Sequence, residues 1–236
     1  MDNRLMNIRL SVAFFNLETR DLMLNSTKLR ELYYRVLAEA QRPLPQADMM
    51  YLVSETRSNQ ASVLDRASEF SGPIGIVGYP DTESRVGYPG SDVWVPELVK
   101  RGISRECIVL IVGSFVDVDG KNIIHTLSEM QALVRHAKIK RIQKIVLVAP
   151  QFHILRSFMC GVHALTTEHY PELRLYPALG TTLDWNEASS HSQGTLKGIR
   201  ADFLVEETIR IYTYHEKGNL PAPEDVLAYL DRRDAT

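Results

Sequence analysis

The chain lacks features that would place it in several large classes of protein. Among its 236 residues only two are cysteines, Cys107 and Cys160, which lie far apart in apolar segments. Two such thiols provide neither a disulfide framework nor the spacing of a zinc site, and they suit a reducing compartment. No apolar run is long enough to span a bilayer, and residues 1–21 lack the cleavage site of a signal peptide. We therefore expect a soluble, cytoplasmic protein with no membrane partner.

An excess of charge of one sign is also missing. The chain has 27 lysines and arginines against 29 aspartates and glutamates, a formal charge of −2. Without a basic excess, we expect no nucleic-acid partner. The apolar fraction of 44% and the charged fraction of 24% are typical of globular proteins, and the length suits one large domain.

Several short motifs with known chemistry are absent. The sequence has no GxGxxG or GxxxxGK[ST] phosphate loop, no GxSxG nucleophile elbow, and no CxxC or HxxxH pair. These absences argue against a standard dehydrogenase, kinase, P-loop enzyme or α/β-hydrolase. In segment 115–122 Gly120 follows directly on Asp119, whereas a calcium loop needs its glycine at the sixth position. We therefore interpret the Asp-Gly pair as a turn and expect no metal.

Apolar runs alternate with amphipathic segments along most of the chain, which is the pattern of βαβ units in a parallel sheet. The predicted strands are 48–54, 73–80, 106–115, 142–150 and 172–178. The predicted helices are 25–40, 61–70, 91–102, 126–137, 152–165 and 199–218, followed by a short peripheral helix, with a polar loop at 179–195. We predict an α/β fold, a Rossmann-like doubly wound parallel sheet of about five strands with a long C-terminal helix. An N-terminal helical extension (1–45), the α/β domain (46–220) and a C-terminal tail (221–236) would form this single domain.

Two of the predicted helices have capping signals at their start. Ser26 or Thr27 can cap the first helix. Thr126 and Glu129 have the spacing of a capping box, in which the hydroxyl accepts from the third amide and the carboxylate reaches back. Capping alone is enough to explain this second pair.

Polar residues follow the predicted strands at the edge where open parallel sheets bind ligands. His153 and Arg156 come three positions apart at a helix start, where free amides and a guanidinium can hold a phosphate or carboxylate. Alternatively, Arg156 pairs with a local acid and His153 caps the helix. We predict His153 as the catalytic residue, which donates a hydrogen bond or moves a proton, since its ordinary pKa is near 6.5. The residues expected to bind the ligand are Arg156, Gln151, Thr126, His125, Ser54, Gly78, Asp81 and Ser114.

The connection at 78–92 is long for a strand-to-helix loop and rich in proline and glycine. It is either a flap over the crevice or a surface insertion.

Four segments also carry a family resemblance. VLVAPQFHILRS (146–157) has the form of a strand followed by TSxFHMxR, and LVKRGISRECIVL (98–110) is similar to LxxxGxxxxxIxxE. IIHTLSEMQALV (123–134) stands in the place of an NTxEN helix start, and ETIRIYTYHEKGNL (207–220) is similar to RIxxYxxKGDL. In this order and over about residues 48–220, the chain resembles the YdcF/SanA/ElyC-like family, the domain of unknown function 218.

The resemblance implies a Rossmann-like domain of poorly defined activity, for which a nucleotide-like ligand such as S-adenosylmethionine has been considered. Some members of the family act in bacterial envelope processes and carry membrane anchors. His153, Arg156 and Thr126 match the family's histidine, arginine and threonine. His125 stands where the family usually has asparagine, so the identity of the ligand does not transfer.

Our leading hypothesis is a domain that binds a small anionic ligand, nucleotide-like or phosphorylated, at the carboxyl ends of the strands. Asp81, Ser54 and Thr126 would shape the wall opposite Arg156. One alternative is a phosphoester hydrolase or transferase assisted by Asp117, Asp119 and His125. Another is a non-catalytic interaction module. The cofactor and the oligomeric state stay open.

Overall fold

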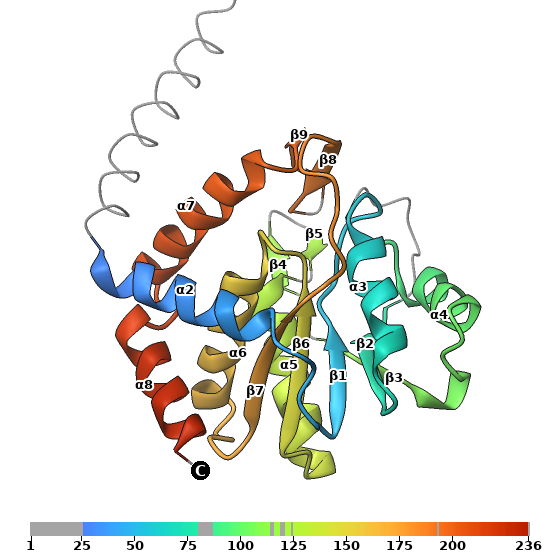
Figure 1. Cartoon of the computed structure of the whole chain (residues 1–236), viewed down its shortest axis with the longest axis horizontal. Coiled ribbons are helices and arrows are strands. Elements are labelled where there is room, and N and C mark those ends of the chain that lie inside the picture. The colour runs from blue at the N-terminus through green and yellow to red at the C-terminus, as the bar shows by residue number, and fades with distance from the viewer. Residues whose placement is uncertain are drawn as a thin grey trace, which may run out of the picture.

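The structure, a computed structural model, describes residues 26–79, 87–113, 116–118, 121–123, 125–192 and 194–235. Figure 1 shows a central sheet with helices packed around it and a small hairpin at the end toward which the strand arrows point. The predicted α/β class and the doubly wound parallel sheet are confirmed. No helix in the described ranges is both long and apolar enough to cross a bilayer.

The central sheet has five parallel strands in the order β3-β2-β1-β6-β7. Their bounds are β1 Met49–Leu52, β2 Ile74–Val77, β3 Ile108–Ile111, β6 Lys144–Ala149 and β7 Arg174–Leu179. Every residue of β1 and β2 is buried, which explains why these strands have continuous apolar sequences. The chain moves outward from β1 to β3 on one side and from β6 to β7 on the other. The strand order therefore reverses between β1 and β6.

The helices lie in two layers. The main ones are α3 Gln60–Arg66, α4 Ser91–Lys100, α5 Thr126–Lys140, α6 Ile154–Thr167 and α7 Asp202–Glu216, and two 3₁₀ turns are Ala67–Glu69 and Arg105–Cys107. Right-handed crossovers on the two sides of the reversal put α3 and α4 on one face and α5 and α6 on the other. In agreement, α3 contacts α4 and α5 packs along α6.

The outer edge of β7 is covered by helices from both ends of the described chain. α2 (Thr27–Ala40) packs against β7 and against α8 (Pro223–Asp234), and Ser26 caps α2 by accepting from the Leu29 amide. Tyr229 on α8 accepts from the Leu175 amide at 2.7 Å, and Arg233 donates to the Leu175 carbonyl at 2.7 Å. These side chains satisfy backbone groups that an edge strand would otherwise expose. The expected short peripheral helix is thus a packed 12-residue helix.

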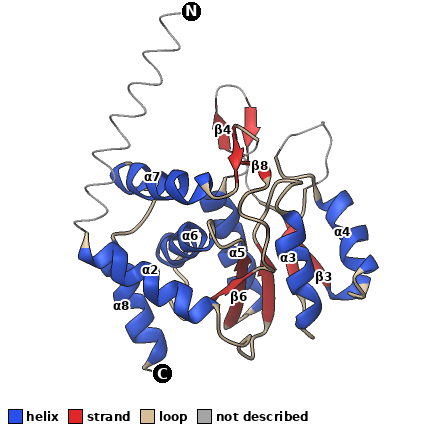
Figure 2. Cartoon of the chain, turned by 45° about the horizontal axis from the view of Figure 1, so that its top comes forward, coloured by secondary structure: helices blue, strands red, loops and turns tan. Residues whose placement is uncertain are grey.

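Two small antiparallel sheets lie outside the central one. β8 (Ala188–His191), inside the polar loop predicted at 179–195, pairs with β9 (Leu196–Ile199) just after it, so the loop contains a strand that was not predicted. β4 (Val116–Val118) pairs with β5 (Lys121–Ile123), with Val118 opposite Lys121. The predicted turn at the Asp-Gly pair falls on residues 119 and 120, which lie outside the described ranges. Figure 2 shows both hairpins at the same end of the sheet.

Candidate functional site

A cavity of about 290 Å³ lies at the carboxyl ends of β1 and β6, where the strand order reverses. This is the position at which open α/β sheets bind their ligands. Its walls come from the segment after β1, the start of α5, the start of α6, the β8–β9 turn and one face of α7. The lining residues are Ser54, Glu55, Thr56, Tyr88, His125, Thr126, His153, Arg156, His191, Ser192, Thr195, Arg210 and Tyr214.

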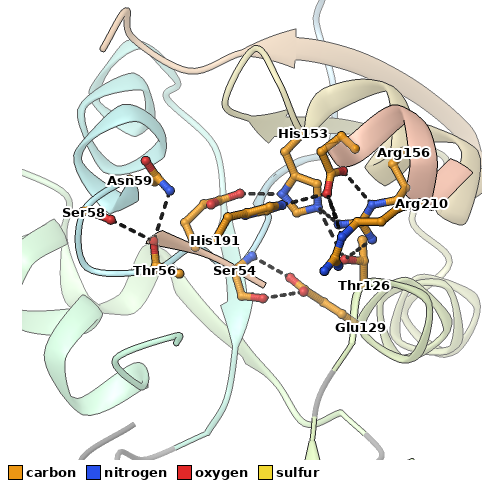
Figure 3. A network of polar contacts seen from close by, with 12 residues as sticks. Ser54, Thr56, Ser58, Asn59, Thr126, Glu129, His153, Arg156, His191 and Arg210 are labelled. Atoms are coloured by element: carbon orange, nitrogen blue, oxygen red, sulfur yellow. Dashed lines mark hydrogen bonds and ion pairs between the residues drawn. The ribbon is translucent and has the colours of Figure 1, made fainter. Parts of the chain in front are cut away.

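Glu129 ties the start of α5 to the end of β1. Its carboxylate accepts from the Ser54 amide at 2.8 Å and the Ser54 hydroxyl at 2.5 Å (Figure 3). It also accepts from the Tyr51 hydroxyl at 2.9 Å. Burial raises the pKa of Glu129, although the bonds from Ser54 and Tyr51 act in the opposite direction. The Ser54 hydroxyl donates to Glu129, so its lone pairs can still accept from the cavity.

The predicted capping box at Thr126 and Glu129 was wrong. The N-cap of α5 is His125, whose Nδ1 accepts from the Ser128 amide at 3.3 Å while the Ser128 hydroxyl accepts from the His125 amide at 3.2 Å. Ser128, rather than Glu129, bonds back to the amide of the N-cap residue, so Glu129 is free to reach Ser54. With Nδ1 accepting, a neutral His125 carries its proton on Nε2. Burial and the charge of Arg156 lower the pKa of His125, which favours this neutral form.

A chain of buried hydrogen bonds runs through Arg156. Its Nε and Nη2 donate to the Glu207 carboxylate at 2.6 and 3.0 Å, and Nη1 donates to the Thr126 hydroxyl at 2.9 Å. Nη2 also lies 2.8 Å from His153 Nε2. Arg156 therefore does pair with an acid, but with one on α7 rather than a local one. Arg156 is 4% exposed, and its charge is already neutralised by Glu207.

The contact with Arg156 determines the tautomer of His153. A guanidinium only donates, so Nε2 must accept, and the ring proton lies on Nδ1. Nδ1 then donates to Glu55 Oε1 at 2.5 Å. Burial and the Arg156 charge lower the pKa of His153 well below 6.5, in agreement with a neutral ring. His153 does not cap α6 with its side chain, and both of its nitrogens are bonded within the protein.

Glu207 is the shared acceptor of the site. Besides Arg156, it accepts from His191 Nε2 at 2.7 Å, while Arg210 Nε lies 3.9 Å away. Burial opposes ionisation of Glu207, but the charge of Arg156 and the contact with His191 outweigh it and hold the pKa well below 4.5. Burial lowers the pKa of His191 in spite of Glu207. A neutral His191 that donates from Nε2 keeps a lone pair on Nδ1.

The hairpin that carries His191 is held by polar contacts. The Thr56 hydroxyl and the Asn59 amide donate to the Ser190 carbonyl at 2.7 and 2.9 Å. Arg200, 2% exposed, follows β9 and donates to Asn59 Oδ1 at 3.1 Å and to the Ser58 carbonyl at 3.2 Å. The turn after β1 therefore positions the β8–β9 wall.

The structure brings most of the predicted site residues together. His153, Arg156, Thr126, His125 and Ser54 all line the cavity. Two others do not lie there. Gln151 lines a separate and much smaller space beside Phe152, and the Gly78 amide donates to the Ile111 carbonyl, extending the β2–β3 ladder. Asp81 and Ser114 lie outside the described residues, as do Asp119 and the side chain of Asp117.

Several residues of the site were missed. Glu55 comes directly after the predicted strand 48–54, so its place after a buried strand was an available signal. Glu207, Arg210 and Tyr214 share one face of α7, as a spacing of three and four requires. Their position over the cavity depends on how α7 packs, which periodicity does not give. His191 had no signal, because its hairpin was not predicted.

One group of residues in the described part of the chain has the composition of a metal site. Glu55, His153 and His191 offer ligand atoms that lie within 4.8 Å of one another. A metal, however, needs a lone pair from each imidazole. The His153 Nε2 lone pair accepts from Arg156 and Nδ1 carries a proton, so this ring has no lone pair left to give. With these hydrogen bonds in place, the three residues do not provide the ligands that a divalent ion needs.

No family model matches this chain, and no similar sequence is found among curated proteins.

Proposed function

We propose that the chain binds a small anionic ligand, phosphorylated or nucleotide-like, in the cavity between the ends of β1 and β6. The observation that carries this proposal is Arg210. Its guanidinium lines the cavity, and its one ion pair in the described part of the chain is the 3.9 Å contact with Glu207. Arg156, the cation expected to hold the ligand, is instead neutralised by Glu207 and supports the wall.

The charge balance around Arg210 favours an anion. Burial and the neighbouring charge of Arg156 lower the pKa of Arg210, and the opposing effects of Glu207, Tyr214 and Glu206 do not offset them. Figure 3 shows the two arginine side chains close to Thr126. An anion would compensate Arg210 and accept charge-assisted hydrogen bonds from its planar fork of N–H groups.

Neutral donors lie on the same wall. The Thr126 hydroxyl accepts from Arg156 and can turn its own hydrogen toward the ligand or toward His153 Nε2, 3.4 Å away, and the Nε2–H of His125 is a second donor. Both residues stand at the start of the 15-residue helix α5, where the helix dipole favours negative charge. These donors supplement Arg210.

Binding is tested by calorimetric titration with inorganic phosphate, ribose 5-phosphate, adenosine monophosphate and S-adenosylmethionine. The last two probe the nucleotide-like class that the family resemblance implies. We expect a phosphorylated ligand to bind and Arg210→Gln to weaken it at least about tenfold, because a charged hydrogen bond to a desolvated anion is lost. The matched control is Arg232→Gln, an exposed arginine on α8. If no probe binds, or if both variants bind equally well, the proposal is wrong.

The hydrolase or transferase alternative has one specific observation in its favour. Burial and the charges of Glu207 and Glu129 raise the pKa of Glu55 well above 4.5, and this carboxyl group lines the cavity. A carboxyl group tuned in this way suits general acid–base chemistry. The test is a screen of phosphate esters with and without Mg²⁺ or Mn²⁺. Turnover that is lost in Glu55→Gln would support the hydrolase or transferase alternative. If no phosphate ester is turned over, this alternative is wrong and only the proposal of ligand binding is left.

A further inference from the structure

Two residues that line the cavity have buried polar atoms that the protein leaves without partners. Among the described residues, five buried side-chain atoms have no hydrogen-bond partner, and two of these, Glu55 Oε2 and Ser192 Oγ, belong to residues that line the cavity. Leaving such atoms unpaired is costly, so native proteins pair nearly all of them. Two together on the walls of one cavity indicate that a bound molecule completes their hydrogen bonds.

Glu55 is the better determined of the two. Its side chain is 1% exposed, and Oε1 accepts the Nδ1 proton of His153 at 2.5 Å. The tautomer of His153, imposed by Arg156, holds the carboxyl group in place with Oε2 as the free atom. If the raised pKa of Glu55 keeps a proton on this carboxyl group, the proton lies on Oε2, because Oε1 is already accepting.

A hydroxyl group satisfies Oε2 in either protonation state. It can donate to a carboxylate oxygen, and it can accept from a carboxylic acid. An ammonium group would serve only the ionised form. A divalent metal is disfavoured because His153 has no lone pair to share with it.

Ser192 supports the same chemistry. It follows β8 with a left-handed backbone (φ 52°), a conformation that non-glycine residues rarely adopt. Thr195 donates to its carbonyl through both amide and hydroxyl, at 3.1 and 2.7 Å, while Oγ has no partner. The unpaired Ser192 hydroxyl can form a hydrogen bond with a hydroxyl group of the ligand, and neither group carries a charge that would have to be desolvated.

We propose that the ligand is a hydroxylated anion, such as a phosphorylated polyol or sugar, whose hydroxyl groups bind Glu55 Oε2 and Ser192 Oγ while its phosphate binds Arg210. This inference rests on the proposed binding of a small anion and adds the class of the ligand. The cavity of about 290 Å³ is at the lower end of the range for small-molecule sites, which suits a ligand of this size.

A matched pair of phosphates tests the hydroxyl contacts. Glycerol 3-phosphate and propyl phosphate share the three-carbon chain and the phosphate but differ in the hydroxyl groups. We expect the unaltered chain to bind glycerol 3-phosphate at least about tenfold more tightly, because only its hydroxyl groups reach the unpaired oxygens. Glu55→Met, which keeps the length but removes both oxygens, should reduce the ratio toward one. Ser192→Ala, which leaves the buried chain of hydrogen bonds intact, should reduce the ratio by a smaller factor.

The possible outcomes separate this inference from the proposed function. Equal binding of the two phosphates overturns the hydroxylated class but leaves an anion site. No binding of either, or of inorganic phosphate, overturns both. A preference that persists in Glu55→Met and in Ser192→Ala also contradicts the assignment. Titration with Zn²⁺ and Mn²⁺ tests the remaining alternative, a metal ion at Glu55 Oε2. Binding of one ion that is abolished by Glu55→Met and by His191→Asn would give Oε2 a metal partner and overturn the inference.

Discussion

Arg156 and Glu207 form a two-point ion pair in the interior, with Nε and Nη2 donating to the two carboxylate oxygens at 2.6 and 3.0 Å. The side chains are 5% and 3% exposed and come from different helices, α6 and α7. The pair fastens α7 across the cavity and leaves Arg210, one turn further along α7, beside the open space. Arg156 Nη2 also lies 2.8 Å from His153 Nε2, and this second contact imposes the tautomer of His153 and therefore the free oxygen of Glu55.

Removing the acid should destabilise the fold strongly. In Glu207→Gln the buried Arg156 loses its counter-charge, and we expect the free energy of unfolding to fall by about 3–5 kcal/mol. Urea unfolding followed by circular dichroism measures this. Glu216→Gln, exposed on the same helix, is the control and should change stability by less than about 0.5 kcal/mol. Equal effects of the two changes would mean that the pair does not hold α7.

The stability of the chain should depend on pH through Glu55. Burial, Glu207 and Glu129 raise its pKa well above 4.5, while Arg156 acts in the opposite direction. The neutral carboxyl group thus contributes stability that is fully present below the unfolded pKa and is lost as the pH rises through the folded pKa. Glu55→Gln stays neutral, so its stability relative to the unaltered chain should increase above about pH 4.5. The increase is about 1.4 kcal/mol for each pH unit over which only the unfolded state is ionised. Urea unfolding between about pH 5 and 8 measures the difference, and a flat or falling difference would contradict the direction.

Arg200 should hold the β8–β9 wall. It bonds to Asn59 and Ser58 after β1, and to the Asp184 carbonyl and Glu187 before β8. Lysine cannot reproduce this planar set of donors, so we expect Arg200→Lys to cost about 2–4 kcal/mol. Hydrogen exchange should become faster in 188–199 before it does so in the central sheet. Arg232→Lys is the matched control, and unchanged exchange in the hairpin would show that other contacts position it.

Two glycines near the sheet should respond differently to alanine. At Gly180, after β7, a new Cβ would meet the Ser62 backbone carbonyl oxygen at 2.7 Å, and this atom cannot move easily. At Gly161, inside α6, the nearest atoms are the flexible ends of Leu175 and Leu147 at 2.8 and 3.2 Å. We expect Gly180→Ala to cost about 1–3 kcal/mol and Gly161→Ala less, because the gain in helix propensity offsets part of the crowding. Thermal unfolding compares them, and the reverse order would contradict the close approach at Ser62.

The central sheet was readable from the sequence because strands buried on both faces leave continuous apolar runs. Met49–Leu52 and Lys144–Ala149 are such runs, and the helices between them have one apolar stripe. The hairpin β8–β9 left no such signal, since its strands, ASSH and LKGI, contain no continuous apolar run and most of their residues are exposed or only partly buried. Glu129 was assigned to a capping box because spacing alone cannot tell whether a carboxylate turns back along its helix or crosses to a neighbouring strand.

Local patterns of apolar and polar residues were therefore enough to predict the class of fold, the order along the chain of the central strands and main helices, and the edge of the sheet where polar residues gather. Packing at long range decided which charges remain available in the cavity. Arg156 is sequestered by Glu207, 51 positions away, and Arg210 is left beside the space. No local pattern contains that result, because the pairing of buried charges depends on which helices meet once the chain has folded.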